Sequence, residues 1–403
     1  MKIAYVTMQF PVASETFAAV EIRALRKLGA KVSVLAFRRA PARAQTMLAE
    51  RGLVDLPIDQ GGAGATLRGL LLLFLRPGDS LPLLIAILSH CWRQPEHLAK
   101  ALALLPRSLD LLQRVEAERP DVVHIFWGHY PSLLGLLVKR RLPQVAVTQF
   151  LGAYDLEKGF PLSRLLAGQA DRLLTHARAN LPALAARGVD PARVEVSYRG
   201  IEIPAAVPAP RKTAGLMVVA ERLVPQKRTA EALRLFAAVA AELPEAQLRV
   251  LGAGPEAERL RSLAVELGLE NRIAFCGHVP HGEVFGHLAE AEVALTLSQS
   301  PSERLPNALK EAMLHRCLCL AAPSPGIDEL IADGKTGLLA APDDLAGAAR
   351  RLAVLLRDPA AAGEMRDKAQ AYILENFDVE RTMSARLRLW SHLVAQRRQG
   401  AAA

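Results

Sequence analysis

Cysteine is scarce in this chain, and the few residues present are scattered. Four cysteines occur in 403 residues, and the pair Cys317 and Cys319 has C-x-C spacing, which is not the C-x-x-C of a zinc or redox site. This excludes a disulfide framework and predicts four small buried residues in a reducing compartment. The first residues also lack the long apolar stretch of a signal peptide, so we expect a cytoplasmic protein.

Disorder-promoting composition is absent as well. Hydrophobic residues make up 51% and charged residues 23% of the chain, which is typical of folded soluble proteins. At about 150 residues per domain, the length predicts two or three domains.

Acidic residues are under-represented only in the first half. Residues 1–205 contain 26 Lys and Arg and 17 Asp and Glu, a net +9, whereas the remaining residues hold 24 of each. A basic half could face nucleic acid, an anionic membrane or a phosphorylated substrate, or could simply be a solvated surface.

No uninterrupted apolar run approaches the roughly 20 residues that span a bilayer. Two shorter runs, residues 70–75 and 81–88, are separated by a polar break around Pro77. Two interpretations stay open: buried helices, or a pair of helices dipping into one leaflet of a membrane.

Strand-like and helix-like segments alternate along the chain. Apolar runs at residues 2–8, 31–37, 121–127, 144–150 and 194–198 predict strands, with a helix at 14–28. A Pro/Ala-rich linker follows at 204–215, and a second series has strands at 216–220, 247–251, 272–276, 293–297 and 318–321.

This alternation predicts an α/β protein with two doubly wound Rossmann-like domains. We place an N-terminal domain at 1–205, joined by a C-terminal helix within 378–403, and a C-terminal domain at 206–377. In such sheets ligands bind at the carboxyl ends of the strands, so we expect the site in a cleft between the domains.

Candidate chemistry lies in loops that follow strands of the second domain. Glu303 is in the loop after residues 293–297, Pro306 suits a helix start, and Glu311 falls inside that helix. Helix N-terminal amides flanked by two carboxylates could bind a phosphate or sugar hydroxyls. Read alone, however, this spacing is also common on surface helices.

Three further loops are predicted at the same edge. Arg222 and Lys227 follow residues 216–220 and could neutralise a diphosphate, although an ordinary basic loop fits equally well. Gly252 and Gly254 form an incomplete Rossmann fingerprint, and a fourth loop begins at Ser324. The convergence of all four loops favours a binding site more than any one motif does.

In this order the motifs resemble a known family. Arg222, Lys227, the Gly252-x-Gly254 turn, Glu303-x-x-Pro306-Asn-x-x-x-Glu311 and the segment from Gly326 to Gly337 are similar to retaining glycosyltransferases of family four, which have the GT-B fold. Toward the N-terminus, Phe10-Pro-x-x-Ser14-Glu-Thr-Phe17 and Asp121-Val-Val-His124 look like the exopolysaccharide branch of colanic-acid type.

The resemblance implies a role for each matching residue. Glu311 would hold the ribose of a nucleotide-sugar, and Glu303 would contact its sugar beside the amides of Leu305 and Asn307. Arg222 and Lys227 would clamp the diphosphate and, with Glu303, form the catalytic group. The remaining candidates are Arg304, Pro306, Gly252 and Gly254 for the donor, and Ser14, Thr16, His124 and His129 on the acceptor side.

The resemblance also sets expectations for cofactors and partners. The chain has no Asp-x-Asp motif, so we expect no metal ion and no cofactor. The expected partners are a nucleotide-sugar donor, a saccharide or lipid-linked acceptor and an anionic membrane surface at the inner face of the plasma membrane, but no nucleic acid.

The chain departs from the family pattern at three places. Arg304 replaces a usual glycine, and Arg199-Gly200-Ile201-Glu202 replaces Asn-Gly-x-Asp. The segment Phe150-Leu-Gly-Ala-Tyr-Asp155 lacks the histidine that relatives tend to have beside a glycine after this strand. Three hypotheses follow: a retaining glycosyltransferase, a sugar-nucleotide epimerase of the same fold, or a non-catalytic nucleotide-sugar-binding protein.

Overall fold

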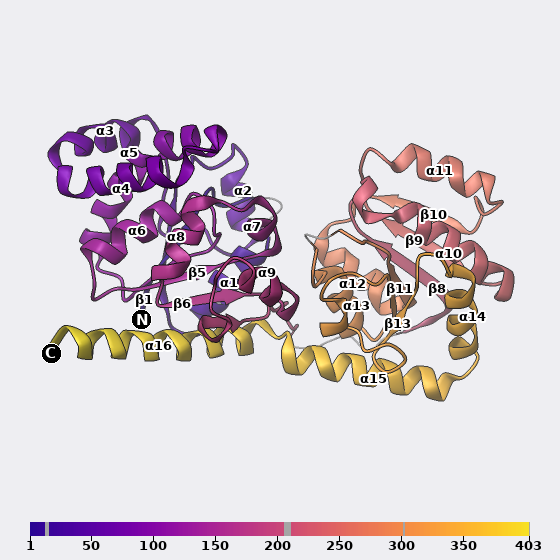
Figure 1. Ribbon diagram of the computed structural model, residues 1–403. Helices are drawn as coiled ribbons and strands as arrows, with labels where there is room; N and C mark the ends of the chain where they lie inside the picture. Colours follow the sequence, from indigo (N-terminus) through magenta and orange to yellow (C-terminus); the bar gives the residue numbers. More distant parts are fainter. Residues whose placement is uncertain (13–15, 205–210, 301–302, 403) are drawn as a thin grey trace. The chain divides into compact units, whose positions relative to one another are not determined.

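The chain divides into two compact units. A computed structural model describes residues 1–12, 16–204, 211–300 and 303–402. Unit 1 comprises Met1–Glu202 and Val379–Ala403, and unit 2 comprises Ile203–Asp378 (Figure 1). The chain therefore leaves unit 1 close to the predicted boundary at 205 and returns to it with the C-terminal helix.

Unit 1 is built on a seven-stranded parallel sheet. Its strand order is β3-β2-β1-β4-β5-β6-β7, so the sequence begins near the middle of the sheet. The central strands are buried along almost their whole length, because helices cover both faces. The strands are β1 (Lys2–Thr7), β2 (Lys31–Ala36), β3 (Ile58–Asp59), β4 (Val122–Ile125), β5 (Ala146–Phe150), β6 (Arg172–Thr175) and β7 (Val194–Val196).

Alternate side chains of this sheet pack into two separate hydrophobic cores, one on each face. Ile3, Tyr5 and Val34 pack on the face covered by α1 and α16, whereas Ala4 and Val6 point to the face covered by α4, α5, α6 and α8. The helices of unit 1 are α1 (Thr16–Lys27), α2 (Ala44–Glu50), α3 (Ala63–Leu75), α4 (Pro77–Cys91), α5 (Pro95–Glu118), α6 (Ser132–Arg141), α7 (Ala153–Lys158), α8 (Pro161–Gln169), α9 (Leu181–Ala185) and α16 (Val379–Ala402), with short 3-10 helices η1 (Arg178–Asn180) and η2 (Pro191–Arg193).

The C-terminal helix α16 is an integral part of unit 1. Trp390 is fully buried, and its ring lies 5.2 Å from that of His124 on β4. Arg386 donates a 2.6 Å hydrogen bond to Glu21 of α1 and two hydrogen bonds to the Ser197 hydroxyl. Apolar burial and a buried ion pair therefore hold the returning helix in place.

Unit 2 contains a six-stranded parallel sheet with the order β10-β9-β8-β11-β12-β13. One face carries α10, α11 and α14, and the other contacts α12, α13 and α15. The strands are β8 (Thr213–Ala220), β9 (Gln247–Leu251), β10 (Ile273–Gly277), β11 (Ala291–Thr296), β12 (Leu318–Ala321) and β13 (Leu338–Leu339). The helices are α10 (Thr229–Glu242), α11 (Ala257–Glu266), α12 (His281–Glu290), α13 (Asn307–Leu314), α14 (Leu345–Leu356) and α15 (Pro359–Asn376), with 3-10 helices η3 (Pro225–Lys227) and η4 (Ile327–Glu329).

The two apolar runs near residue 77 form helices that are only half buried. Leu72, Leu83 and Ile87 join the core, but neighbouring residues such as Phe74 and Ile85 are exposed. Within the described ranges no single helix is long and apolar enough to cross a membrane; α3 and α4 meet that criterion only together, with a bend of 101° between them.

Candidate functional site

The four candidate loops of unit 2 lie at one edge of its sheet. Each follows one of the adjacent parallel strands β9, β8, β11 and β12, so all four emerge at carboxyl ends. Contacts join them: the Ser298 hydroxyl donates to the Gln226 carbonyl at 3.2 Å, and the Leu223 amide donates to the Ala253 carbonyl at 3.0 Å. This is the edge at which doubly wound sheets bind ligands.

Gly252 and Gly254 allow two of these loops to touch. A Cβ atom on Gly252 would lie 1.8 Å from the Glu221 carbonyl oxygen, and one on Gly254 would lie 2.2 Å from that of Leu223. Such contacts are impossible, so both positions require glycine for backbone packing. The loop after β9 is thereby held against the loop that carries the two candidate cations.

Lys227 and Glu303 form an ion pair across that edge. The Lys227 ammonium, at the end of η3, donates to a Glu303 carboxylate oxygen at 2.5 Å, and both side chains are largely buried. The Arg222 side chain is exposed and has no hydrogen bond or ion pair with any residue that the structure describes. Of the two candidate cations, Lys227 is thus paired and Arg222 is exposed.

Glu221 is a third carboxylate here, and sequence reasoning missed it. Its carboxyl group is enclosed although the residue is partly exposed, and it accepts a 2.8 Å hydrogen bond from the Thr229 hydroxyl. Burial raises the pKa of Glu221 to about 7, with Lys227 acting in the opposite direction. Its position beside Arg222, directly after a buried strand, is the signal that could have identified it.

The helix that follows Glu303 begins one residue later than predicted. Pro306 is the cap, Asn307 is the first residue of α13, and the cap has no side-chain hydrogen bond. Leu305 and Pro306 are buried, Arg304 is half-buried, and the Asn307 side chain accepts a 3.1 Å hydrogen bond from Lys310. No residue within the described ranges accepts a hydrogen bond from the first backbone amides of α13, so these amides are available to a ligand or water.

Glu311 is paired with a histidine that the sequence analysis did not single out. His281, the first residue of α12, lies 2.9 Å from a Glu311 carboxylate oxygen through Nε2. This hydrogen bond raises the pKa of His281. The Glu311 side chain is 12% exposed and that of His281 is 70% exposed, so a ligand that reaches Glu311 meets His281 first.

The acceptor-side candidates that the structure describes, Thr16, His124 and His129, belong to unit 1. Ser14 lies outside the described residues, and Thr16 is exposed at the start of α1. His124 is fully buried with Nδ1 2.9 Å from the Thr148 hydroxyl, and burial lowers its pKa well below the usual value. His129 is half-buried, and burial lowers its pKa to about 4. Both histidines are neutral at pH 7, and the position of His124 favours a structural role.

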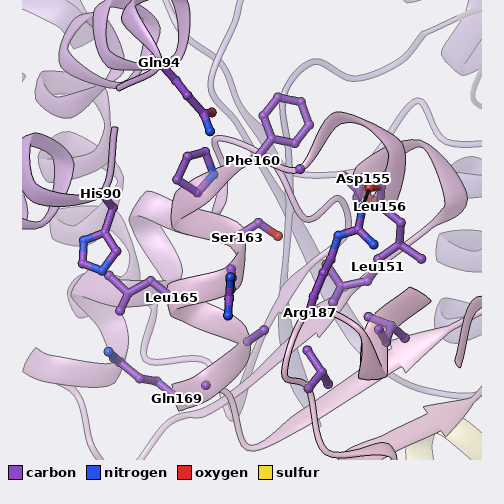
Figure 2. Close-up of a pocket in the computed structure, with 17 residues that line it drawn as sticks. His90, Gln94, Leu151, Asp155, Leu156, Phe160, Ser163, Leu165, Gln169 and Arg187 are labelled. Atoms are coloured by element: carbon purple, nitrogen blue, oxygen red, sulfur yellow. Dashed lines mark hydrogen bonds between the residues drawn. The ribbon is translucent and has the colours of Figure 1, made fainter. Parts of the chain in front are cut away.

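A cavity of about 730 Å³ opens in unit 1. Figure 2 shows Arg187 and Asp155 on one side, His90 and Gln169 on the other, and Ser163 between them. Leu151 also lines the cavity, which therefore reaches the carboxyl end of β5. Apolar walls with a few polar groups are typical of small-molecule sites.

Together these groups can bind an anionic ligand that carries hydroxyls. The cations Arg222 and Lys227 match a diphosphate, and Glu303 and Glu311 can accept hydrogen bonds from sugar hydroxyls. Among the described residues no cluster of His, Cys, Asp or Glu has the arrangement of a metal site.

The two units match two protein families. Residues 14–203 match the family described as Glycosyltransferase Family 4, and residues 203–373 match Glycosyl transferases group 1. The two matches meet at the boundary between the units and together cover almost the whole chain.

The similarity to individual relatives covers most of the sequence. The chain is 27% identical to WcaL of Salmonella typhimurium, a glycosyltransferase assigned to colanic acid biosynthesis, over 89% of this chain and 91% of the relative. It is also 27% identical to the amylovoran biosynthesis glycosyltransferase AmsK of Erwinia amylovora, over 89% and 90%. These similarities bear out the likeness to the colanic-acid branch.

Solved structures share the fold. HepE of Anabaena, in complex with UDP, superposes with a TM-score of 0.72 at 17% identity, covering 97% of this chain and 100% of that one. The lipopolysaccharide outer core galactosyltransferase WaaB gives a TM-score of 0.68 at 18% identity, with 97% and 100% coverage. The predicted fold of two Rossmann-like domains, the GT-B fold, is confirmed.

Proposed function

We propose that this chain, a glycosyltransferase whose N-terminal unit matches Glycosyltransferase Family 4 and whose C-terminal unit matches Glycosyl transferases group 1, transfers a sugar from a nucleotide-sugar to a saccharide or lipid-linked acceptor with retention of configuration. The observation that carries this proposal is the group Arg222, Lys227, Glu303 and Glu311 at one edge of the unit 2 sheet.

The donor diphosphate binds to Arg222 and Lys227. Arg222 supplies a planar fork for phosphate oxygens, and Lys227 exchanges its ion pair with Glu303 for a contact to the diphosphate. Glu303 is thereby released toward the sugar hydroxyls. The ribose takes the place of His281 as hydrogen-bond partner of Glu311.

Transfer then proceeds on one face of the sugar. The anomeric carbon–oxygen bond to the diphosphate breaks, and the acceptor hydroxyl forms the new bond on the face that the diphosphate leaves. A phosphate oxygen takes the acceptor proton, so the products are the glycoside and a protonated nucleoside diphosphate. Fixed cations stabilise the charge on the leaving group, and we propose that no metal ion is needed.

Support for the acceptor and the location comes from the relatives. WcaL and AmsK are named for polysaccharides, colanic acid and amylovoran, so we propose an exopolysaccharide intermediate as the acceptor. A lipid carrier would place the reaction at the inner face of the plasma membrane. The cavity of unit 1 is the candidate acceptor pocket, because it reaches the end of β5 at Leu151.

A product analysis tests the reaction class. The protein is incubated with UDP-glucose and other nucleotide-sugars together with lipid-linked saccharides, and NMR of the product reads the configuration at the anomeric carbon. Retention in a new glycoside supports the proposal. An inverted glycoside, an epimerised donor without transfer, or binding without turnover on any acceptor would each replace it with another function.

Arg304 offers a test of donor choice. The proposed site has an arginine beside Glu303 where relatives have glycine, so Arg304→Gly should change affinity for a nucleotide-sugar or for its nucleoside diphosphate. A loss confined to the sugar form assigns Arg304 to the sugar, and an equal loss assigns it to the phosphates. Unchanged affinity for both ligands removes Arg304 from the site.

A further inference from the structure

The outward faces of α3 and α4 carry large exposed apolar side chains at helical spacing. Phe74, for example, is 82% exposed and Ile85 is 63% exposed. We call this set the outer apolar face; it consists of Leu67, Leu70, Leu71, Phe74 and Leu75 on α3, Leu81, Ile85 and Leu88 on α4, and Trp92 directly after α4. Large exposed apolar side chains gathered on neighbouring helices mark an interaction surface in a folded protein.

The fold does not need these side chains for its own packing. A different stripe of α3, including Ala65 and Gly69, is buried, and a Cβ on Gly69 would lie 2.1 Å from the Pro106 carbonyl oxygen of α5. On α4, Leu83 and Ile87 fill the core. Each helix therefore has one apolar stripe that packs in the core and a second apolar stripe that the rest of the protein leaves exposed.

The solvent-exposed charged side chains of α3, α4 and the two residues that follow are all positive. Between residues 63 and 93 there are three arginines, and the one carboxylate, Asp79, is buried. Carboxylates of α5 pair with Arg68 and Arg76, so among the described residues Arg93 is the one arginine of this segment without an ion pair. The Arg93 guanidinium lies 4.6 Å from the ring centre of Trp92, a pairing of cation and aromatic ring suited to a lipid headgroup boundary.

Unit 1 as a whole is strongly basic. With the C-terminal helix included, it holds 31 Lys and Arg against 18 Asp and Glu, a net +13, whereas unit 2 holds 19 and 23, a net −4. Because α16 is basic and returns to unit 1, the difference in net charge between the two units is larger than that between the two halves of the sequence. A charge of this sign attracts anionic lipid and opposes contact with a second copy of the same face.

We propose that the outer apolar face docks unit 1 on an anionic phospholipid bilayer, with α3 and α4 inserted at the headgroup level of one leaflet. The 101° bend between the helices fits shallow insertion, and amphipathic helices of this kind sink about 5–10 Å into the headgroup and acyl boundary. Docking deepens the proposed function, because His90 in the last turn of α4 and Gln94, the N-cap of α5, also line the cavity proposed for the acceptor.

The test is vesicle sedimentation with matched variants. Wild-type protein should bind vesicles of phosphatidylcholine mixed with phosphatidylglycerol, bind phosphatidylcholine alone much less, and lose binding in high salt. Phe74→Asp and Ile85→Asp should each weaken binding about tenfold or more, since each removes an exposed apolar side chain that the membrane would bury and adds a charge that anionic lipid repels. Val54→Asp is the control, because Val54 is 65% exposed in unit 1 but lies outside these helices.

Two further measurements make the result decisive. Trp92 fluorescence should shift to the blue with anionic vesicles, and Trp92→Phe should remove that shift. Equal binding to neutral and anionic vesicles, no binding to either, or an equal loss in the Val54 control would overturn the proposal. So would a dimer in gel filtration that Phe74→Asp converts to a monomer without any vesicle binding by the wild type. UDP-glucose binding in solution is measured in parallel, and its absence would count against the proposed function alone.

Discussion

Arg386 is the residue whose removal should most weaken unit 1. Its side chain is fully buried, and it donates to Glu21 and to the Ser197 hydroxyl from the returning helix α16. Arg386→Met leaves the Glu21 carboxylate buried with Tyr5 as its remaining hydrogen-bond partner. Breaking a buried pair in this way costs about 3–5 kcal/mol, which is a factor of roughly 10² to 10⁴ in the unfolding equilibrium.

Urea unfolding measured by tryptophan fluorescence isolates this effect. Trp92, Trp127 and Trp390 are the three tryptophans of the chain, and all belong to unit 1. The double variant Glu21→Gln/Arg386→Met removes both charges and should recover most of the lost stability, because neutral replacements of buried pairs are often tolerated. A loss below about 1 kcal/mol in Arg386→Met, or a double variant less stable than the single one, would refute the reasoning.

Three further predictions concern unit 2. Because the pKa of Glu221 is raised to about 7, the unfolded chain loses this proton first as pH rises, and stability falls by about 3 kcal/mol between pH 4.5 and 7. Glu221→Gln should therefore be more stable than wild type at pH 8 and similar at pH 4, and equal stability at both would contradict the pKa shift. The raised pKa of His281 predicts that affinity for UDP-glucose, which competes for Glu311, increases as pH rises above about 6.5; calorimetric titration should find a flat profile in His281→Gln. Transfer activity should survive EDTA, and a complete loss restored by manganese would exclude a metal-free mechanism.

The fold was largely predictable because its strands are buried on both faces. The strands at Gln247–Leu251 and Leu318–Ala321 match the predicted ranges. An uninterrupted apolar run marks Leu318–Ala321, whereas in Gln247–Leu251 buried apolar residues alternate with Gln247 and Arg249. Strands β3, β6 and β13 were not predicted. Strands β3 and β13 have two residues each and β6 has two apolar residues, which is too few to show any periodicity. The exposure of α3 and α4 was also beyond prediction, as an apolar run does not tell a core helix from a surface helix.

The sequence predicted which loops form the candidate site, but it did not predict which side chains of those loops contact each other. Sheet topology brings the ends of β8 and β11 together, so the sequence could place Lys227 and Glu303 at one edge. Their ion pair depends on the conformation of two loops far apart in sequence, which no spacing rule gives. The same holds for His281 and Glu311, whose contact arises from the packing of α12 beside α13.

Ligand-induced stabilisation of the native protein by UDP-glucose tests the assigned donor site most directly. A ligand that binds only the folded state at 100 times its Kd adds about 2.7 kcal/mol, which a thermal-shift experiment detects. Wild-type protein and the surface controls Lys335→Met and Glu266→Ala should gain melting temperature with UDP-glucose or another nucleotide-sugar. Lys227→Met and Glu311→Ala should keep nearly the wild-type melting temperature without ligand and should lose most of that gain. A full wild-type shift in both site variants would contradict the assignment of the donor site to this edge of the sheet.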